Sequence, residues 1–209
     1  MSRLILALDV TDRKRAMKIV NDTKEHLYAV KVGWPLVMNA GMSIVSEISE
    51  KINVICDFKV ADIPNTTKLI VLSAKSYGAS GIIVHGFVGS DSVKAAVESA
   101  GDMNVYVVTE MSHPGALDFL QVHATKLVKI AVESGASGII APATRPERLR
   151  EIRKIAGNLT ILAPGVGAQG GSAKAAIDAG ADYIIVGRRI YNSENPREEA
   201  AKILMELKN

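Results

Sequence analysis

A cluster of charged residues ends the third apolar run of the chain and holds the residue types best suited to chemistry. Residues 57–62 read DFKVAD, and they follow directly on the apolar stretch 54–56. Asp57 and Lys59 are two positions apart, so on a strand both side chains point to the same side. Lys31 lies between two valines in the preceding apolar run and could reach Asp57. Because burying unpaired charge is expensive, we expect these groups to pair, with the lysines keeping Asp57 ionised.

Asp62 completes this acid–base cluster, and it also has a plain structural interpretation. It precedes Ile63-Pro64, where it could cap a helix. The Asp57–Lys59 pair could likewise be a stabilising ion pair. Buried ion networks stabilise proteins poorly and gather at functional sites. Lys31, Asp57, Lys59 and Asp62 together therefore favour a functional site.

Two later segments are suited to binding an anion. Residues 164–171 read PGVGAQGG after one apolar run, and Gly187-Arg188-Arg189 follows the next. Glycine lets backbone N–H groups approach an anion closely, and arginine offers two parallel hydrogen bonds to a phosphate. We therefore expect a phosphate site in these two loops.

The segment 109–115, TEMSHPG, is the third feature of interest, because proline and glycine prevent it from being helical. It could be a lid or an ordinary long connection. His85 and His113 could be general bases. A hydrogen-bonding residue at a strand end is the interpretation we favour for each of them.

The elements that must position these residues alternate along the chain. Eight apolar runs occupy residues 4–8, 29–32, 54–58, 81–84, 105–108, 138–141, 160–163 and 183–186. Helical patterns occupy residues 12–25, 35–50, 64–77, 90–100, 116–134, 146–156, 173–179 and 196–207. The runs are continuously apolar, as in parallel strands covered on both faces. Eight β–α units predict an α/β fold, a (β/α)8 TIM barrel forming a single domain over residues 1–209, and an open doubly wound sheet is the alternative.

Composition narrows the class of protein further. The 209 residues are 48% hydrophobic and 22% charged, with 25 basic against 22 acidic residues, for a net charge of +3. The basic residues are spread along the chain without a basic block, so the sequence gives no indication of nucleic-acid binding. No apolar run is long enough to span a membrane. The single cysteine, Cys56, cannot form an internal disulfide. We therefore expect a cytoplasmic protein.

The chain resembles the orotidine 5′-monophosphate decarboxylase family in its short prokaryotic form. The resemblance runs from Leu4 to the final helix, on the motifs LD at 8–9, VKVG at 30–33 and DFKVADIP at 57–64. Further matching motifs are TEMSHPG at 109–115, PGVGAQGG at 164–171 and VGR at 186–188. The resemblance implies a cytoplasmic carboxy-lyase that converts orotidine monophosphate to uridine monophosphate and CO2, without metal or organic cofactor.

The resemblance also implies roles for individual residues. Lys59 would protonate the carbanion at C6, Asp57 would face the substrate carboxylate, and Lys31 would bind the ribose and hold Asp57. Asp9 would contact the ribose. The remaining implied substrate contacts are Ser112 at the pyrimidine, Gln169 between lid and phosphate, Gly187 and Arg188 at the phosphate, and Pro164, Gly165 and Val166 in the glycine-rich loop. A homodimer is implied, with Asp62, Ile63 and Thr66 reaching into the neighbouring subunit's site.

Two other functions remain as alternatives. Sugar-phosphate enzymes that resemble 3-keto-gulonate 6-phosphate decarboxylase share the Asp-x-Lys-x-x-Asp strand but need Mg²⁺, held in part by a glutamate. Lys31 stands in that place here, and a cation there would repel Mg²⁺. A catalytically silent barrel that only binds nucleotide phosphate is the second alternative, although it would not need the four charged residues.

Overall fold

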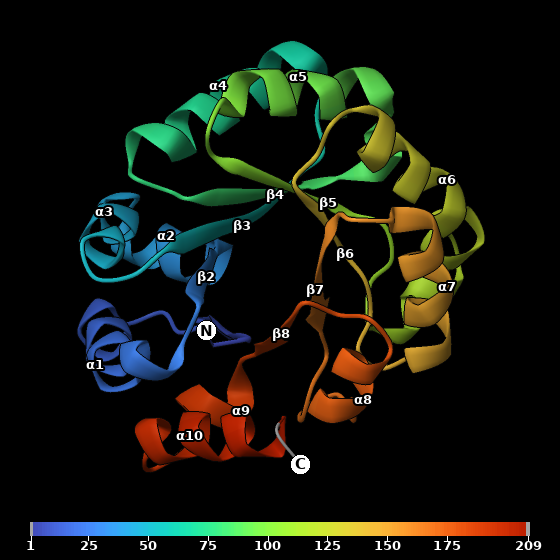
Figure 1. Cartoon of the computed structure of the whole chain (residues 1–209). Helices are drawn as coiled ribbons and strands as arrows, with labels where there is room; N and C mark the ends of the chain where they lie inside the picture. Colours follow the sequence, from blue (N-terminus) through green and yellow to red (C-terminus); the bar gives the residue numbers. More distant parts are fainter. Residues whose placement is uncertain (1, 208–209) are drawn as a thin grey trace.

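The strands close into one parallel barrel. The computed structural model describes residues 2–207, so Met1, Lys208 and Asn209, at the ends of the expected domain, lie outside the described residues. Each strand pairs in parallel with the next, and β8 pairs with β1 (Figure 1). The strands are β1 (Leu4–Ala7), β2 (Ala29–Gly33), β3 (Val54–Val60), β4 (Gly81–His85), β5 (Asn104–Val108), β6 (Gly138–Ile140), β7 (Thr160–Pro164) and β8 (Tyr183–Val186). The predicted (β/α)8 barrel is confirmed, and the open sheet is wrong because the last strand, β8, pairs with the first, β1, so the eight strands form a closed ring.

Helices surround the barrel, as Figure 1 shows. They are α1 (Arg13–Thr23), α2 (Trp34–Ala40), α3 (Ser43–Ser49), α4 (Pro64–Ser76), α5 (Ser90–Ala100), α6 (Leu120–Glu133), α7 (Pro146–Ala156), α8 (Ala173–Asp178), α9 (Arg188–Tyr191) and α10 (Pro196–Glu206). Short 3-10 turns lie at η1 (Lys24–His26), η2 (Gly86–Val88) and η3 (Pro114–Leu117). None of the helices within residues 2–207 is long and apolar enough to cross a membrane.

Two apolar cores explain why the strands are apolar on both faces. The larger core fills the space between strands and helices, and the smaller one fills the barrel interior. Ala29 and Ile55 belong to the interior core. Because side chains alternate along a strand, Lys31 and Asp57, two positions further on, also point into the barrel. The charged side chains of Lys31 and Asp57 therefore lie directly above the apolar core of the barrel interior.

Two predicted helical segments and one predicted loop need correction. The segment 35–50 is two helices, because Gly41 adopts a left-handed φ of 76° that ends α2. The segment 116–134 becomes α-helical only at Leu120, since the residues after Pro114 form 3-10 hydrogen bonds, such as Asp118 N–H to the Gly115 carbonyl. Arg188, predicted to lie in a loop, starts the four-residue helix α9, which is too short to give a periodic pattern.

Candidate active site

A cavity of about 580 Å³ opens at the ends of the strands. The predicted residues that line it are Asp9, Lys31, Asp57, Lys59, Ser112, Pro164, Gly165, Val166, Gln169, Gly187 and Arg188. They come from β2, β3 and β7, from the segments that follow β1, β5, β7 and β8, and from the start of α9. Ile83, Val108 and Ile140 line the same cavity and are buried. The cavity therefore has a charged side and an apolar side.

The charged side is an alternating array of carboxylates and ammonium groups. Lys31 Nζ lies 2.5 Å from Asp57 Oδ2 and 3.8 Å from Asp9 Oδ1. Lys59 Nζ donates to both Asp57 oxygens, at 2.7 and 2.8 Å. Lys31 and Asp57 are buried, whereas the Lys59 side chain is 37% exposed. Asp57 is therefore held between two cations, and the outer one is open to the cavity.

This arrangement fixes the charge state of the buried pair. Burial alone would raise the pKa of Asp57, but the charges of Lys31 and Lys59 outweigh burial and hold that pKa below its ordinary value. Burial alone would lower the pKa of Lys31, yet Asp57 and Asp9 raise it. At neutral pH Asp57 is therefore ionised and Lys31 is protonated.

Strand β3 is irregular where it presents Lys59. Cys56 lies opposite Ile82 and Val60 lies opposite Val84, so four steps along β3 match two along β4. Within this bulge Lys59 has a φ of 43°, in the left-handed region that side-chain-bearing residues rarely adopt. Such a conformation costs about 1–3 kcal/mol of conformational free energy, and residues that adopt it are found most often at functional sites. The backbone is therefore strained at the residue whose ammonium faces the cavity.

His85 ends β4 beside this array. Its ring lies 4.5 Å from the ring of Phe87, and among the described residues its buried Nδ1 atom has no hydrogen-bond partner. Burial is the main cause that lowers the pKa of His85, and the positive charge of Lys59 adds to it. The negative charge of Asp57 acts in the opposite direction, and the resulting pKa is about 4. The imidazole is thus neutral at pH 7 and a weak base, which disfavours the alternative of a general base.

The pKa of His85 predicts a stability loss in mild acid. The unfolded chain binds a proton at this histidine near pH 6.5, whereas the folded chain binds it only near pH 4. Stability therefore falls as pH drops through that window. Urea unfolding at several pH values is expected to show this loss, and a smaller one in His85→Gln. Asp57 does not contribute to this window because its ordinary pKa is 3.8 and its folded value is lower. An equal loss in the variant would contradict the assignment.

The glycine-rich loop after β7 and the start of α9 also line the cavity. Val166 and Gly171 form a bridge, and Gly171 N–H donates to the Gly165 carbonyl at 3.0 Å. Gly165 has a φ of 103°, and a Cβ there would come within 2.9 Å of Ser112. Glycine is therefore needed where this loop meets the segment after β5.

Two adjacent arginines at α9 have different environments. Arg189 is bonded to Glu199 at 2.6 Å and to Glu206 at 2.5 Å. The Arg188 side chain is exposed and lines the cavity. An arginine at this end of a barrel, next to a glycine loop and a short extra helix, can bind a phosphate. Arg188 rather than Arg189 is therefore available to an anion.

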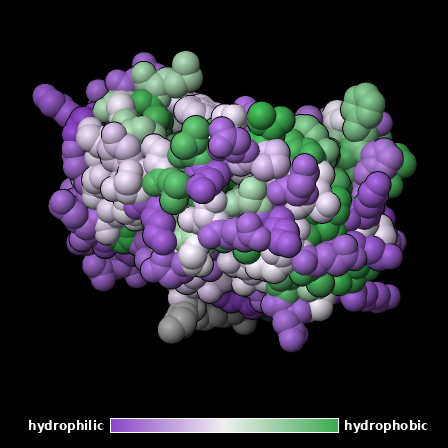
Figure 2. Space-filling view, turned by 90° about the horizontal axis from the view of Figure 1, so that it is seen from above, coloured by the Kyte–Doolittle hydropathy of each residue, from purple (hydrophilic) through white to green (hydrophobic). Residues whose placement is uncertain are grey.

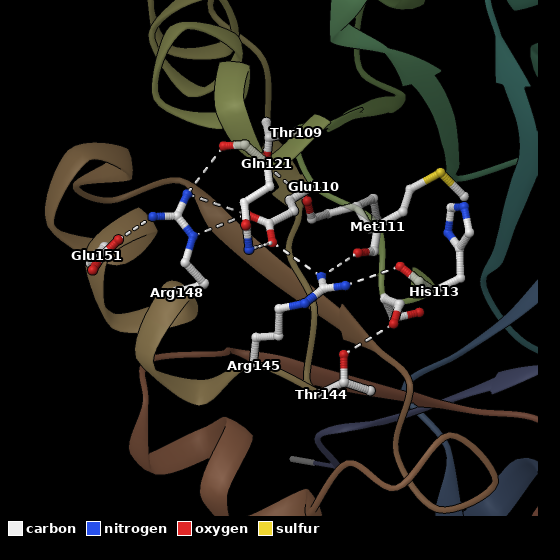
Figure 3. A network of polar contacts seen from close by, with 11 residues as sticks. Thr109, Glu110, Met111, His113, Gln121, Thr144, Arg145, Arg148 and Glu151 are labelled. Carbon is white, nitrogen blue, oxygen red and sulfur yellow. Dashed lines mark hydrogen bonds and ion pairs between the residues drawn. The ribbon is translucent and has the colours of Figure 1, made fainter. Parts of the chain in front are cut away.

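The segment after β5 is tied to the start of α7 by a polar network (Figure 3). Glu110 is fully buried and is paired with Arg145 at 3.1 Å and Arg148 at 3.4 Å. Arg145 also donates to the carbonyls of Met111 and His113, at 2.8 and 3.0 Å. This network holds the backbone on both sides of Ser112, whose own carbonyl accepts from the Thr144 hydroxyl at 3.2 Å. Sequence reasoning missed these partners, although a charged residue, Glu110, two positions after an apolar run was a signal.

Three predicted site residues lie away from the cavity of their own chain. Asp62 and Ile63 are exposed, Ile63 to 67%, and Thr66 is half-buried. The Asp62 carboxylate accepts from the neighbouring Ile63 N–H at 2.7 Å and does not cap α4, so the alternative structural interpretation of Asp62 as a helix cap is wrong. The structure therefore does not bring these residues to the array within one chain.

Comparisons with known proteins agree along the whole chain. The model of the family described as orotidine 5′-phosphate decarboxylase / HUMPS matches residues 2–203. The orotidine 5′-phosphate decarboxylase of Methanococcoides burtonii is 56% identical over 209 residues, covering 99% of this chain and 97% of that protein. The crystal structure of the Methanocaldococcus jannaschii decarboxylase, in complex with the inhibitor BMP, has a TM-score of 0.95 and 51% identity, with 100% of both chains covered. The structure from Pyrococcus horikoshii has a TM-score of 0.92 and 47% identity, with 99% of both chains covered.

Proposed function

Because the chain belongs to the orotidine 5′-phosphate decarboxylase / HUMPS family, we propose that it converts orotidine 5′-monophosphate to uridine 5′-monophosphate (UMP) and CO2. This carboxy-lyase reaction is a step of pyrimidine biosynthesis. The observation that carries the proposal is the array in which Asp57 lies between Lys31 and Lys59, in a cavity that Arg188 also lines. A nucleotide offers a base to the charged array and a phosphate to Arg188.

The substrate would lie with its phosphate at the α9 end. Arg188 and the backbone of Gly187 hold the phosphate, and the glycine-rich loop 164–171 lies beside it. Lys31 and Asp9 bind the ribose, and Ser112 meets the pyrimidine. Gln169 lies between the segment after β5 and the phosphate. Binding energy from the distant phosphate can thereby orient the base and exclude water.

The chemistry follows from the charges around C6. The C6–carboxylate bond breaks, CO2 leaves, and the electron pair stays on C6. Asp57 faces the substrate carboxylate. Two carboxylates about 4 Å apart repel each other by about 4 kcal/mol at an effective dielectric constant of 20. The loss of CO2 removes this repulsion. The Lys59 ammonium stabilises the developing negative charge and then gives C6 its proton. The resulting amine regains a proton from solvent, to which the Lys59 side chain is 37% exposed.

The proposal includes no metal and no organic cofactor. The oxygens of Asp57 are already bonded to two ammonium groups, which a divalent cation would have to displace. Sugar-phosphate enzymes that need Mg²⁺ are the alternative within the same family, and a silent phosphate-binding barrel is the alternative outside it. Lys31, where the Mg²⁺ enzymes hold a glutamate, favours decarboxylation of the nucleotide.

Ultraviolet absorbance separates these functions. Purified protein is mixed with orotidine 5′-monophosphate, first with EDTA and then with Mg²⁺ in excess. We expect the orotate absorbance to disappear at the same rate in both. Turnover of a sugar phosphate only with Mg²⁺ would contradict the proposal in favour of the relative, and no turnover of either substrate would favour the silent barrel.

We further propose a homodimer in which Asp62, Ile63 and Thr66 complete the site of the neighbouring subunit. Exposed apolar side chains support this, since Ile63 is 67% and Leu69 on α4 is 60% exposed. Figure 2 shows hydrophobic side chains standing among charged ones on the side of the barrel that lies at the top of Figure 1.

A cytoplasmic location of the protein stays a prediction.

Mixing two inactive variants tests the shared site. Lys59→Ala disables its own site, whereas Asp62→Ala would disable the partner's. After random subunit exchange, half of the dimers are hybrids with one intact site of two, so activity is expected to recover to about a quarter of the wild-type value. Light scattering checks that each variant still dimerises. If the mixture stays as inactive as its components, Asp62 does not serve the partner's site.

A further inference from the structure

The peptide plane between Phe58 and Lys59 controls where the Lys59 ammonium points. The φ angle of Lys59 is the rotation about its N–Cα bond relative to this plane, and it is 43°. In a regular strand φ would be near −120°, and the side chain would leave the backbone in another direction. The bulge also shifts the pairing of β3 with β4 between Cys56 and Val60. Something other than regular ladder pairing must therefore hold this plane.

Trp34 makes that contact. Its indole Nε1–H donates to the Phe58 carbonyl at 3.0 Å, and its ring stacks on the Phe58 ring with centroids 4.5 Å apart. The sheet register explains this contact. Gly33, the last residue of β2, lies opposite Asp57 on β3, so Trp34 at the start of α2 follows beside Phe58. The hydrogen-bonded carbonyl belongs to the same peptide plane that sets φ of Lys59.

We propose that Trp34 is a positioning residue for Lys59, holding the Phe58–Lys59 peptide so that the ammonium faces Asp57 and the reacting carbon. This inference rests on the proposed function. Trp34 lines the cavity and is 47% exposed, so it is not simply a core residue. Ring packing alone would need only the aromatic face, whereas fixing the peptide plane needs the N–H group.

Trp34→Phe separates these two contributions, because phenylalanine keeps an aromatic ring and loses the donor. We expect kcat for orotidine 5′-monophosphate to fall about tenfold or more, since small displacements of a reacting group are costly. KM should stay within about twofold, because the proposed phosphate and ribose contacts are untouched. Met38→Ala is the matched control, because Met38 is a 79% exposed apolar residue on α2, the helix that begins at Trp34. The kcat of this variant should equal that of the wild type.

Each outcome decides the inference. Wild-type kcat in Trp34→Phe would overturn it, and so would a parallel loss of kcat and substrate affinity, which would assign Trp34 to the shape of the binding site. If the wild-type chain itself does not turn over the nucleotide, the proposed function fails instead. The two failures are therefore distinguishable.

A second variant covers the case in which Trp34→Phe does not fold. The chain has one tryptophan, so replacing tryptophan by benzothienylalanine during expression exchanges only the N–H of Trp34 for sulfur. A reduced kcat with unchanged KM supports the positioning role, and full activity overturns it. Thermal unfolding of this protein should stay close to that of the wild type, because the ring and its stacking on Phe58 are kept.

Discussion

Replacing Lys59 with alanine is expected to lower kcat by at least about 10⁴-fold while the barrel stays folded and still binds UMP. The change removes both the proton donor and the cation that stabilises charge at C6. The fold should survive because Asp57 keeps its partner Lys31, at 2.5 Å, so no buried carboxylate is left unpaired. Turnover by absorbance and UMP binding by calorimetry measure the two expectations separately.

Lys94→Ala is the matched control for this change. Lys94 lies on α5 with 67% of its side chain exposed, and its nearest carboxylate oxygen, on Glu98, is 3.9 Å away. This variant should turn over substrate like the wild type. Substantial turnover by Lys59→Ala would remove Lys59 from the chemistry, and loss of UMP binding together with turnover would show that it serves binding.

Replacing Arg188 with alanine is expected to lower kcat/KM by about 10²- to 10³-fold, mostly through KM, because truncating one partner of a charged hydrogen-bonded pair is costly. Arg188 is exposed and lines the cavity, whereas the adjacent Arg189 is engaged by Glu199 and Glu206. Steady-state kinetics with orotidine 5′-monophosphate gives both constants, and calorimetry with UMP gives the loss of affinity directly.

Arg150→Ala on α7 is the control for Arg188, since it removes a half-exposed arginine whose ion pair is with Glu147. Its KM should match the wild type. If Arg188→Ala also kept the wild-type KM, the phosphate would have to bind elsewhere, and the proposed orientation of the nucleotide would be wrong.

The barrel and its charged array could be predicted from the sequence because both rest on local rules. Continuous apolar runs at regular spacing predict parallel strands, and the two-residue alternation places Asp57 on the same face as Ile55. The contact between Lys31 and Asp57 follows from two neighbouring strands in register. The family resemblance, now confirmed along the chain, supplied the roles, which the residues alone did not.

The bulge at Lys59 could not be predicted, because a lysine carries no sequence signal for a left-handed φ. The value of 43° is imposed by contacts between strands and by Trp34, which are tertiary. The ion pair of Glu110 with Arg145 joins residues 35 positions apart in the sequence, so no local sequence pattern predicts it.

The expected roles of Asp62, Ile63 and Thr66 depend on a second chain. Their exposure is compatible with an interface, but the residues of one chain cannot specify where the neighbour lies. The unpredicted helix α9 has a simpler cause. Four residues make one turn, and this turn is held by hydrogen bonds from the Ile190 and Tyr191 N–H groups to the carbonyl of Gly187, the residue directly after β8.

Exchange of the C6 proton of UMP tests most directly whether Lys59 protonates C6. The group that gives a proton to the C6 carbanion must also remove it in the reverse direction, and this step does not involve CO2. UMP is incubated with the protein in D2O, and the C6 proton is followed by NMR. The account predicts that this signal disappears with the wild-type protein and persists with Lys59→Ala. Exchange at the wild-type rate in Lys59→Ala would contradict it.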